Sequence, residues 1–457
     1  MRKIEKRAVL CLLIALALVA GLCLFCVRYI LHASEWASYP FNRHMYSNSG
    51  QLLNGSVLDR DGDVLSDVVD GTRIYHDDAT VRRATVHAVG DPAGNIGTGA
   101  LTAFADRVSG YNLLTGGYSP LGTGRNMTLS IDAYLNVTAY NAMDGRQGAV
   151  GVYNYKTGDI LCMVSTPSFD PMNPPDLSGD NAETLDGIYV NRFLSSAQVP
   201  GSIFKTVTLT AALETLPDLE SRTFQCTGET TVGGSVITCP KPHGTMDIQS
   251  ALANSCNGVF ASLAAEMGGD VMTQYVQKAG LTSRMSVDGI QTAAGHYDVS
   301  QADKGQIGWS GVGQYTDTVN PCNMMTFMGA IANGGKAAVP RLILDLTTTN
   351  GFPVTWERTD QTGTLIEAST ASKVKDMMKN NVTQTYGTDR FRGLNIGAKS
   401  GTAEVGGDKR PNAWFAGFLD DPEHPYAFIV LVENGGGGAS VAGEIAATVL
   451  QACVDKF

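Results

Sequence analysis

The stretch Pro200-Gly201-Ser202-Ile203-Phe204-Lys205 is followed at once by an apolar-periodic run that extends to Leu213. Because a Pro-Gly pair cannot lie inside a helix, we expect a helix to begin at Ser202. Ser202 and Lys205 would then share one face of that helix, with Cβ atoms about 5–6 Å apart. A serine hydroxyl becomes a good nucleophile only when a base removes its proton, and a desolvated lysine can act as that base. These features predict a serine that performs acyl transfer.

Two later motifs distinguish Ser202 from a chance match. Ser255-Cys256-Asn257 and Lys399-Ser400-Gly401-Thr402 follow it in that order. Taken singly, each motif is equally compatible with a cap, a turn or an edge strand. A second serine–lysine pair, Ser372 to Lys375, falls in a predicted surface helix, and Lys156-Thr157-Gly158 falls at a predicted hairpin turn. We interpret these two as structural, because only the ordered set suits one catalytic chemistry.

The amino-terminal part predicts a membrane anchor. Four basic side chains in the first seven residues precede the uncharged run Ala8–Val27, which is long enough to cross a bilayer as a helix. A cleaved signal peptide is the alternative, but no clear small-x-small cleavage site follows the run. Positive charge before the span favours a cytoplasmic amino terminus. We therefore expect a cytoplasmic tail at 1–7, a transmembrane helix at 8–31, and the remaining chain outside the cytoplasm.

Composition excludes several classes of protein. The chain has 457 residues, of which 43% are hydrophobic and 17% charged, so it is neither disordered nor fibrous. Its net charge is −11, and the part after the span has no sizeable basic cluster. Nucleic acid is therefore not expected as a partner.

Three interpretations remain open for the cysteines outside the span. Cys226 and Cys239 bracket a glycine-rich segment with the pattern of a hairpin, and a disulfide between them is the favoured interpretation for an extracytoplasmic chain. Free thiols are the second. A zinc site using both cysteines and His243 is the third, but the sequence offers no obvious fourth ligand. A cysteine nucleophile, Cys256 with His243 or His296, has no supporting local motif.

The order of predicted elements indicates an α+β fold. A strand–turn–strand over Gly55–Leu65 precedes a second hairpin, a mostly helical middle, three strands and a terminal helix. Short links between the last three strands imply antiparallel pairing, with helices packed on the sheet. We expect a small β-rich domain at 32–126 and a larger domain at 127–457. The three strands are predicted at Gly397–Glu404, Ala413–Phe418 and Tyr426–Glu433.

From about residue 128 to the end, the chain resembles the transpeptidase domain of class B penicillin-binding proteins. The three motifs carry the resemblance, together with Asn191-Arg192 before the serine and the run Ala413 to Gly417. The resemblance implies an antiparallel sheet flanked by helices, preceded by a pedestal or dimerisation-like domain. The segment before residue 127 has no room for a glycosyltransferase domain, which implies the monofunctional class.

The resemblance also implies a role for each motif residue in cutting the bond between two D-alanines of a peptidoglycan stem peptide. Ser202 would be the nucleophile, Lys205 its base, and Ser255 the proton relay. Asn257 would bind an amide of the substrate, Lys399 would supply positive electrostatics, and Ser400, Gly401 and Thr402 would bind the substrate. The backbone N–H groups of Ser202 and Thr402 would form the oxyanion hole.

Beyond the site, the resemblance implies β-lactam inhibition, no cofactor, and a polytopic membrane glycosyltransferase as partner. Two other functions remain open: a hydrolase of the carboxypeptidase or β-lactamase type, and a membrane-bound β-lactam sensor or scaffold. The predicted anchor and amino-terminal domain argue against a secreted β-lactamase. The presence of Ser202, Lys205 and Lys399 argues against an inactive scaffold.

Overall fold

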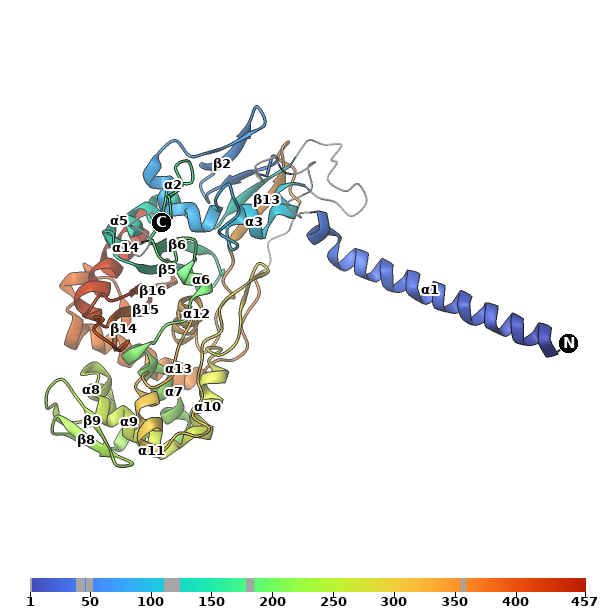
Figure 1. Ribbon diagram of the computed structural model, residues 1–457. Helices are drawn as coiled ribbons and strands as arrows, with labels where there is room; N and C mark the ends of the chain where they lie inside the picture. The colour runs from blue at the N-terminus through green and yellow to red at the C-terminus, as the bar shows by residue number, and fades with distance from the viewer. Residues whose placement is uncertain (1, 38–45, 47–51, 111–123, 178–184, 355–358) are drawn as a thin grey trace.

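The computed structural model describes residues 2–37, 46, 52–110, 124–177, 185–354 and 359–457. Its first helix, α1 (Arg2–Ala37), extends away from the rest of the molecule (Figure 1). Within the apolar segment Lys3–Ala33 of α1, the most apolar 18-residue window has a mean hydropathy of 3.0, and none of that window is buried. A helix this long and apolar can span a bilayer, which agrees with the predicted anchor.

A five-stranded antiparallel sheet forms the centre of the body, in the order β14-β15-β16-β5-β6. Nearly every residue of these strands is buried, because helices cover both faces of the sheet. The predicted antiparallel pairing of the last three strands is confirmed. The strands are β5 (Gly148–Asn154), β6 (Ile160–Thr166), β14 (Ile396–Ala403), β15 (Asn412–Leu419) and β16 (Tyr426–Val432).

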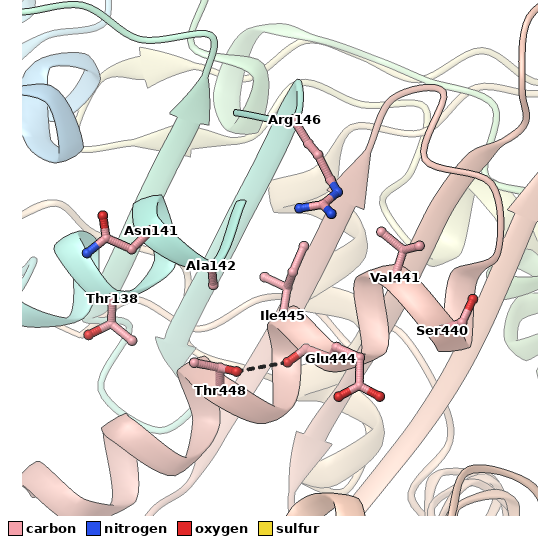
Figure 2. Close-up of a pocket in the computed structure, with 9 residues that line it drawn as sticks. All are labelled: Thr138, Asn141, Ala142, Arg146, Ser440, Val441, Glu444, Ile445 and Thr448. Carbon is pink, nitrogen blue, oxygen red and sulfur yellow. Dashed lines mark hydrogen bonds between the residues drawn. The ribbon is translucent and has the colours of Figure 1, made fainter. Parts of the chain in front are cut away.

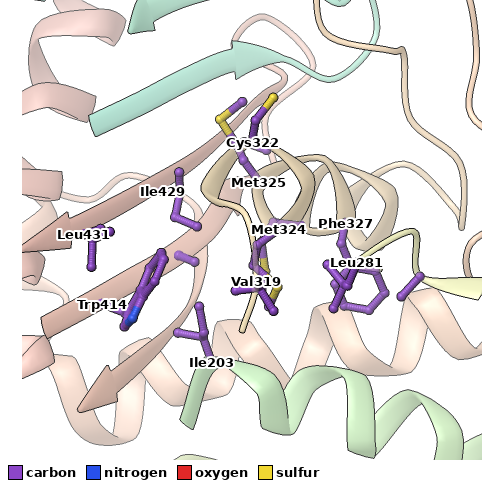
Figure 3. Close-up of a cluster of buried hydrophobic side chains, with 14 of the residues drawn as sticks. Ile203, Leu281, Val319, Cys322, Met324, Met325, Phe327, Trp414, Ile429 and Leu431 are labelled. Carbon is purple, nitrogen blue, oxygen red and sulfur yellow. The ribbon is translucent and has the colours of Figure 1, made fainter. Parts of the chain in front are cut away.

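One face of this sheet is covered by α5 (Ala133–Met143) and α14 (Gly443–Lys456), whose apolar side chains form one core with it. The other face is covered by α12 (Pro321–Ala332), in which every residue is buried. Figure 3 shows α12 side chains packed near Trp414 of β15 and Ile203. Ile203 directly follows the predicted nucleophile, so the hydrophobic core fixes the turn that carries Ser202.

A mostly helical lobe lies beyond the β14 edge of the sheet (Figure 1). A two-stranded sheet, β11·β12, lies apart from this lobe, close to Arg107 and Leu342, which donate to Asp288 in its turn. The lobe itself carries two small two-stranded sheets, β7·β10 and β8·β9. The predicted hairpin between Cys226 and Cys239 is one of them. The elements of the lobe are η1 (Gly201–Phe204), α7 (Lys205–Thr215), η2 (Leu219–Ser221), β7 (Phe224–Cys226), β8 (Glu229–Val232), β9 (Ser235–Thr238), β10 (Gly244–Met246), α8 (Ile248–Ala253), α9 (Asn257–Met267), α10 (Gly269–Lys278), α11 (Lys304–Gly311) and α13 (Ala368–Asn381). Nearer the sheet lie α6 (Arg192–Ser195), η3 (Val382–Tyr386), η4 (Asp389–Phe391) and η5 (Gly438–Ala442). The separate pair is β11 (Ser286–Val287) and β12 (Ile290–Gln291).

A second five-stranded sheet, ordered β13-β4-β1-β2-β3, lies at the opposite end of the body. β1 and β2 form the predicted antiparallel pair around Asp61-Gly62. β4 crosses the expected domain boundary at residue 126, and β13 comes from much later in the chain, so this sheet joins the two predicted segments. Its elements are β1 (Ser56–Leu58), β2 (Val64–Val69), β3 (Thr72–Tyr75), β4 (Arg125–Leu129) and β13 (Ile343–Thr348), beside α2 (Ala79–Val89), α3 (Ala100–Ala103) and α4 (Ala105–Val108).

Candidate active site

Ser202 lies in a tight turn rather than at the start of an α-helix. Residues Gly201–Phe204 form the 3₁₀ turn η1, and α7 begins only at Lys205. Gly201 has a φ of 54°, a left-handed conformation that glycine adopts without strain. A Cβ on Gly313 would lie 2.1 Å from the Gly201 carbonyl oxygen, so close packing of two glycine backbones holds the turn. The expected helix start is thus corrected: the left-handed glycine leads into a 3₁₀ turn, which places Ser202 one turn before Lys205.

Lys205 connects the first motif to the second. Its side chain is fully buried, and its Nζ donates to the Ser255 carbonyl oxygen at 2.7 Å and to Asn257 Oδ1 at 2.6 Å. A third hydrogen bond reaches Ser255 Oγ at 3.1 Å. One buried amine therefore holds both polar residues of the Ser255-Cys256-Asn257 motif in place.

The second motif occupies a strained turn between α8 and α9. Ser255 has a φ of 52°, a conformation that is uncommon for a residue with a Cβ and that recurs at functional sites. Cys256 is the N-cap position of α9, and Asn257 is the first residue of that helix. Asn257 Nδ2 donates to the Thr238 carbonyl oxygen at 2.8 Å, which ties the turn to the end of β9.

The third motif lies on β14, the edge strand of the central sheet. Lys399 is fully buried, and its Nζ donates to Ser255 Oγ at 2.9 Å and to the Ser400 carbonyl oxygen at 2.9 Å. Ser255 Oγ therefore lies between two lysines. A Cβ on Gly401 would be 2.8 Å from the Pro200 carbonyl oxygen, so a glycine lets β14 approach the serine turn closely.

The three motifs meet around one cavity of about 710 Å³. Fourteen residues line it, and six of them are predicted site residues or their direct neighbours. The lining is Ser202, Thr238, Cys239, Pro240, Asn254, Ser255, Asn257, Trp309, Val312, Gln314, Tyr315, Ser400, Thr402 and Glu404. Lys205 and Lys399 lie behind this wall, in contact with Ser255. The arrangement brings together a serine, a buried lysine and a second serine, the types of side chain that acyl transfer requires.

Burial sets the protonation of the two lysines. It lowers the pKa of Lys205 to about 7, against a smaller opposite effect of the Cys256 and Cys239 sulfurs. Burial, followed by the charge of the neighbouring Lys205, holds the pKa of Lys399 well below its ordinary value. A lysine with a pKa near 7 is partly neutral at physiological pH, which a general base requires.

The rate of acylation by a penicillin is therefore expected to depend on pH. Only the neutral amine of Lys205 can accept a proton, and with a pKa of about 7 the neutral fraction rises about tenfold per pH unit below pH 7. We expect the second-order rate constant to rise between pH 5.5 and 7 and to level off above pH 8. Stopped-flow labelling across that range measures it, and a flat profile would contradict the role of Lys205.

Sequence reasoning missed several residues of the site. Tyr386 accepts from the Ser400 backbone N–H at 2.8 Å, and its hydroxyl lies 3.0 Å from Ser400 Oγ. Trp414 Nε1 donates to the Val199 carbonyl oxygen at 2.9 Å, beside the serine turn. Tyr386 follows the polar helix α13 and belongs to none of the motifs, so no sequence signal indicated it. Trp414 belongs to the run Ala413 to Gly417, which is typical of the resembled family, but that run did not predict its hydrogen bond to Val199.

The two alternative motifs lie away from the cavity. Ser372 is exposed on α13, and Lys375 Nζ donates to Asp420 at 3.2 Å. Lys156 to Gly158 form the turn between β5 and β6. A separate hollow of about 480 Å³ lies between α5 and α14 (Figure 2). Among the described residues that line it there is one serine, Ser440, and no lysine, so it lacks the pair that acyl transfer needs.

The predicted disulfide is corrected by the structure, in which Cys226 and Cys239 are both free thiols. Cys239 Sγ is 3.8 Å from the sulfur of Cys256, and Cys226 Sγ is 3.4 Å from His243 Nδ1. The two cysteines therefore share their surroundings with a third thiol and an imidazole, which the linear spacing of Cys226 and Cys239 did not indicate.

Comparisons with known proteins show which family the chain resembles. Residues 148–451 match the family described as the penicillin binding protein transpeptidase domain. Peptidoglycan D,D-transpeptidase PbpA of Mycolicibacterium smegmatis is 30% identical over 353 residues, which cover 70% of each chain. Its counterpart of the same name in Mycobacterium tuberculosis is 28% identical over 374 residues, covering 73% of this chain and 72% of the relative.

Solved structures share the fold. The ceftriaxone acyl-enzyme complex of penicillin-binding protein A from M. tuberculosis aligns with a TM-score of 0.76 at 24% identity, covering 87% of this chain and 98% of that one. The D,D-transpeptidase domain of a peptidoglycan glycosyltransferase from Eggerthella lenta aligns with a TM-score of 0.75 at 24% identity, covering 88% and 98%. The predicted α+β architecture is thereby confirmed.

Proposed function

The chain belongs to the penicillin-binding protein transpeptidase family, and from this premise we propose that it is a peptidoglycan D,D-transpeptidase acting through Ser202. The observation that carries the proposal is the hydrogen-bond network of Lys205, Ser255, Asn257 and Lys399 beside the cavity that Ser202 lines. The names of the M. smegmatis and M. tuberculosis relatives support the same activity.

In the acylation step, Ser202 Oγ bonds to the carbonyl carbon of the penultimate D-alanine, and its proton passes to neutral Lys205. The backbone N–H groups of Ser202 and Thr402 stabilise the oxyanion. The peptide C–N bond then breaks, and Ser255 relays a proton from Lys205 to the leaving nitrogen. The hydrogen bond between Lys205 Nζ and Ser255 Oγ supports this path. Terminal D-alanine departs and leaves an ester on Ser202.

The β14 edge and Asn257 would bind the substrate. An edge strand presents unpaired backbone groups, to which an extended peptide can add as a further strand. Ser400 and Thr402 line the cavity from that edge and would bind the terminal carboxylate, while Lys399 lies behind them and donates a hydrogen bond to Ser255 Oγ. Gly401 has no side chain, which leaves room for β14 to approach the turn that carries Ser202. Asn257 would bind an amide of the donor peptide.

In the second step, the amine of another stem peptide attacks the Ser202 ester, forms the cross-link and returns the proton to the enzyme. β-Lactams would acylate the same serine. The acyl-enzyme complexes of M. tuberculosis penicillin-binding protein A with ceftriaxone, imipenem and penicillin G support this extension.

The helix α1 is long and apolar enough to cross a membrane, and we propose that it anchors the enzyme there. Basic residues precede the span, so we propose a cytoplasmic amino terminus and an extracytoplasmic catalytic domain. A monofunctional cross-linking enzyme needs newly made glycan strands. We therefore propose a polytopic membrane glycosyltransferase as its partner.

A donor–acceptor assay tests the activity. The full chain in detergent is incubated with a stem peptide ending in D-Ala-D-Ala and a labelled D-amino acid as acceptor, and the products are separated by mass spectrometry. We expect release of D-alanine together with a donor that carries the label. Release of D-alanine with only hydrolysed donor would instead establish the carboxypeptidase activity and contradict transpeptidation.

A further inference from the structure

Four potential metal ligands converge next to the catalytic turn. The sulfurs of Cys226, Cys239 and Cys256 and a ring nitrogen of His243 all lie within 4.8 Å of one another. Cys226 ends β7, Cys239 follows β9, His243 precedes β10, and Cys256 caps α9. Cys256 supplies the fourth ligand, which sequence spacing alone had not revealed. We propose that these four side chains bind one structural zinc ion.

The distances fit tetrahedral zinc. With Zn–S bonds of about 2.3 Å and a Zn–N bond of about 2.0–2.1 Å, a tetrahedron places two sulfurs about 3.8 Å apart and a sulfur and a nitrogen about 3.5 Å apart. Cys239 Sγ and Cys256 Sγ are 3.8 Å apart, and Cys226 Sγ and His243 Nδ1 are 3.4 Å apart. Both of these distances match edges of the tetrahedron, and the remaining ligand pairs lie within 4.8 Å.

The donor set selects zinc and a structural role. Three thiolates and one imidazole form a Cys₃His set, one of the usual compositions of structural zinc sites. Cys239 and His243 are separated by three residues, a spacing typical of zinc ligand pairs. Four protein ligands leave no open coordination position, so the ion would take no part in the acyl-transfer chemistry.

A disulfide accounts for the cluster less well. Three thiols cannot all pair with one another, so any disulfide leaves one cysteine beside it unexplained. It also gives no role to His243, whose ring nitrogen faces Cys226. A zinc ion uses all four side chains at once.

The surrounding fold explains why a structural metal ion would be useful here. Residues 224–246 form two separate two-stranded sheets, β7·β10 and β8·β9, and such pairs are marginal by themselves. A zinc ion would join the ends of three of these strands to α9. Small scaffolds with little core of their own are commonly held in this way.

The same ion would position the active site. Cys256 stands between Ser255 and Asn257, both of which contact Lys205. Cys239 and its neighbour Thr238 line the cavity, and Thr238 accepts from Asn257. The metal would therefore fix the cavity wall relative to the catalytic turn, and its loss would slow acylation without altering a catalytic side chain.

Metal content tests the proposal. The full chain is purified in detergent without added metal and analysed by inductively coupled plasma mass spectrometry. We expect about one zinc per wild-type chain, a similar content in Cys11→Ser, whose thiol lies in α1, and loss of zinc in Cys226→Ser and His243→Ala. His243→Ala is decisive because it changes no thiol, so a disulfide would survive it.

Thiol protection provides a readout that does not depend on the folding of variants. In the wild-type chain, Cys226, Cys239 and Cys256 are expected to resist alkylation until a chelator strips the metal. The chelator should also lower the thermal unfolding midpoint and the rate of penicillin labelling, and zinc should restore both. The proposal would be overturned if the wild-type chain contained no zinc after purification in zinc-supplemented buffer. A stoichiometric disulfide between two of the three cysteines would overturn it as well.

Discussion

Replacing Ser202 with alanine is expected to lower covalent penicillin labelling by at least about 10³-fold, to the background of the assay. The expectation rests on position, because Ser202 is the serine of the three-motif cavity that lies one turn before the buried Lys205. The hydroxyl oxygen is the atom that forms the bond, and alanine removes only that atom. The side chain is half-buried, so we expect unfolding free energy to change by no more than about 0.5 kcal/mol.

Ser372→Ala is the matched control for Ser202→Ala. It removes the serine of the second serine–lysine pair, which is exposed on α13. Labelling of this variant is expected to equal that of the wild type. Gel fluorescence after a fixed exposure to fluorescent penicillin, with circular dichroism to confirm folding, measures both variants. Full labelling of folded Ser202→Ala, or lost labelling of folded Ser372→Ala, would show that a different serine is the nucleophile.

Replacing Lys205 with arginine is expected to reduce the acylation rate by about 10²–10⁴-fold. Arginine keeps a positive charge and can donate hydrogen bonds, but its guanidinium does not lose a proton in proteins. The substitution therefore separates the two roles of Lys205, namely holding Ser255 and Asn257 and accepting the Ser202 proton. Burial lowers the pKa of Lys205 to about 7, and arginine has no comparable neutral form.

Lys205→Met and Lys375→Arg complete that experiment. Methionine has neither the charge nor the hydrogen bonds, so we expect lower thermal stability than in Lys205→Arg along with slow acylation. Lys375→Arg changes the lysine of the second pair, which contacts Asp420 on the surface, and should acylate at the wild-type rate. Stopped-flow measurement of the second-order rate constant compares them. Wild-type acylation by Lys205→Arg would exclude Lys205 as the base.

The central sheet was predictable because its signals are local. Buried strands such as β16 read as continuous apolar runs, and short links between β14, β15 and β16 dictate antiparallel pairing. The motifs indicated their chemistry through residue type and order, and the structure places all three at one cavity.

The features that escaped prediction depend on contacts between distant segments. β13 (Ile343–Thr348) pairs with β4 (Arg125–Leu129), which lies far earlier in the chain, and no local pattern encodes that partner. Tyr386 contacts Ser400 from a segment just after α13 that belongs to none of the motifs. The disulfide prediction weighed the spacing of Cys226 and Cys239, whereas the fold brings Cys256 to the same place through the α8–α9 turn. Backbone geometry, in particular the left-handed Gly201, also decided where the helix after Ser202 begins.

The most direct test of Ser202 acylation is to map and time the penicillin adduct on the wild-type chain. The full chain in detergent is labelled with fluorescent penicillin, freed of excess drug, and sampled over hours for intact mass and for peptide mapping. The account predicts one adduct per chain, on the peptide that contains Ser202, persisting through the time course because water resolves the ester slowly. An adduct on another residue would contradict this prediction, and so would folded chain that takes up no label. Rapid loss of the label with turnover of the drug would show that the enzyme is a hydrolase rather than a transpeptidase.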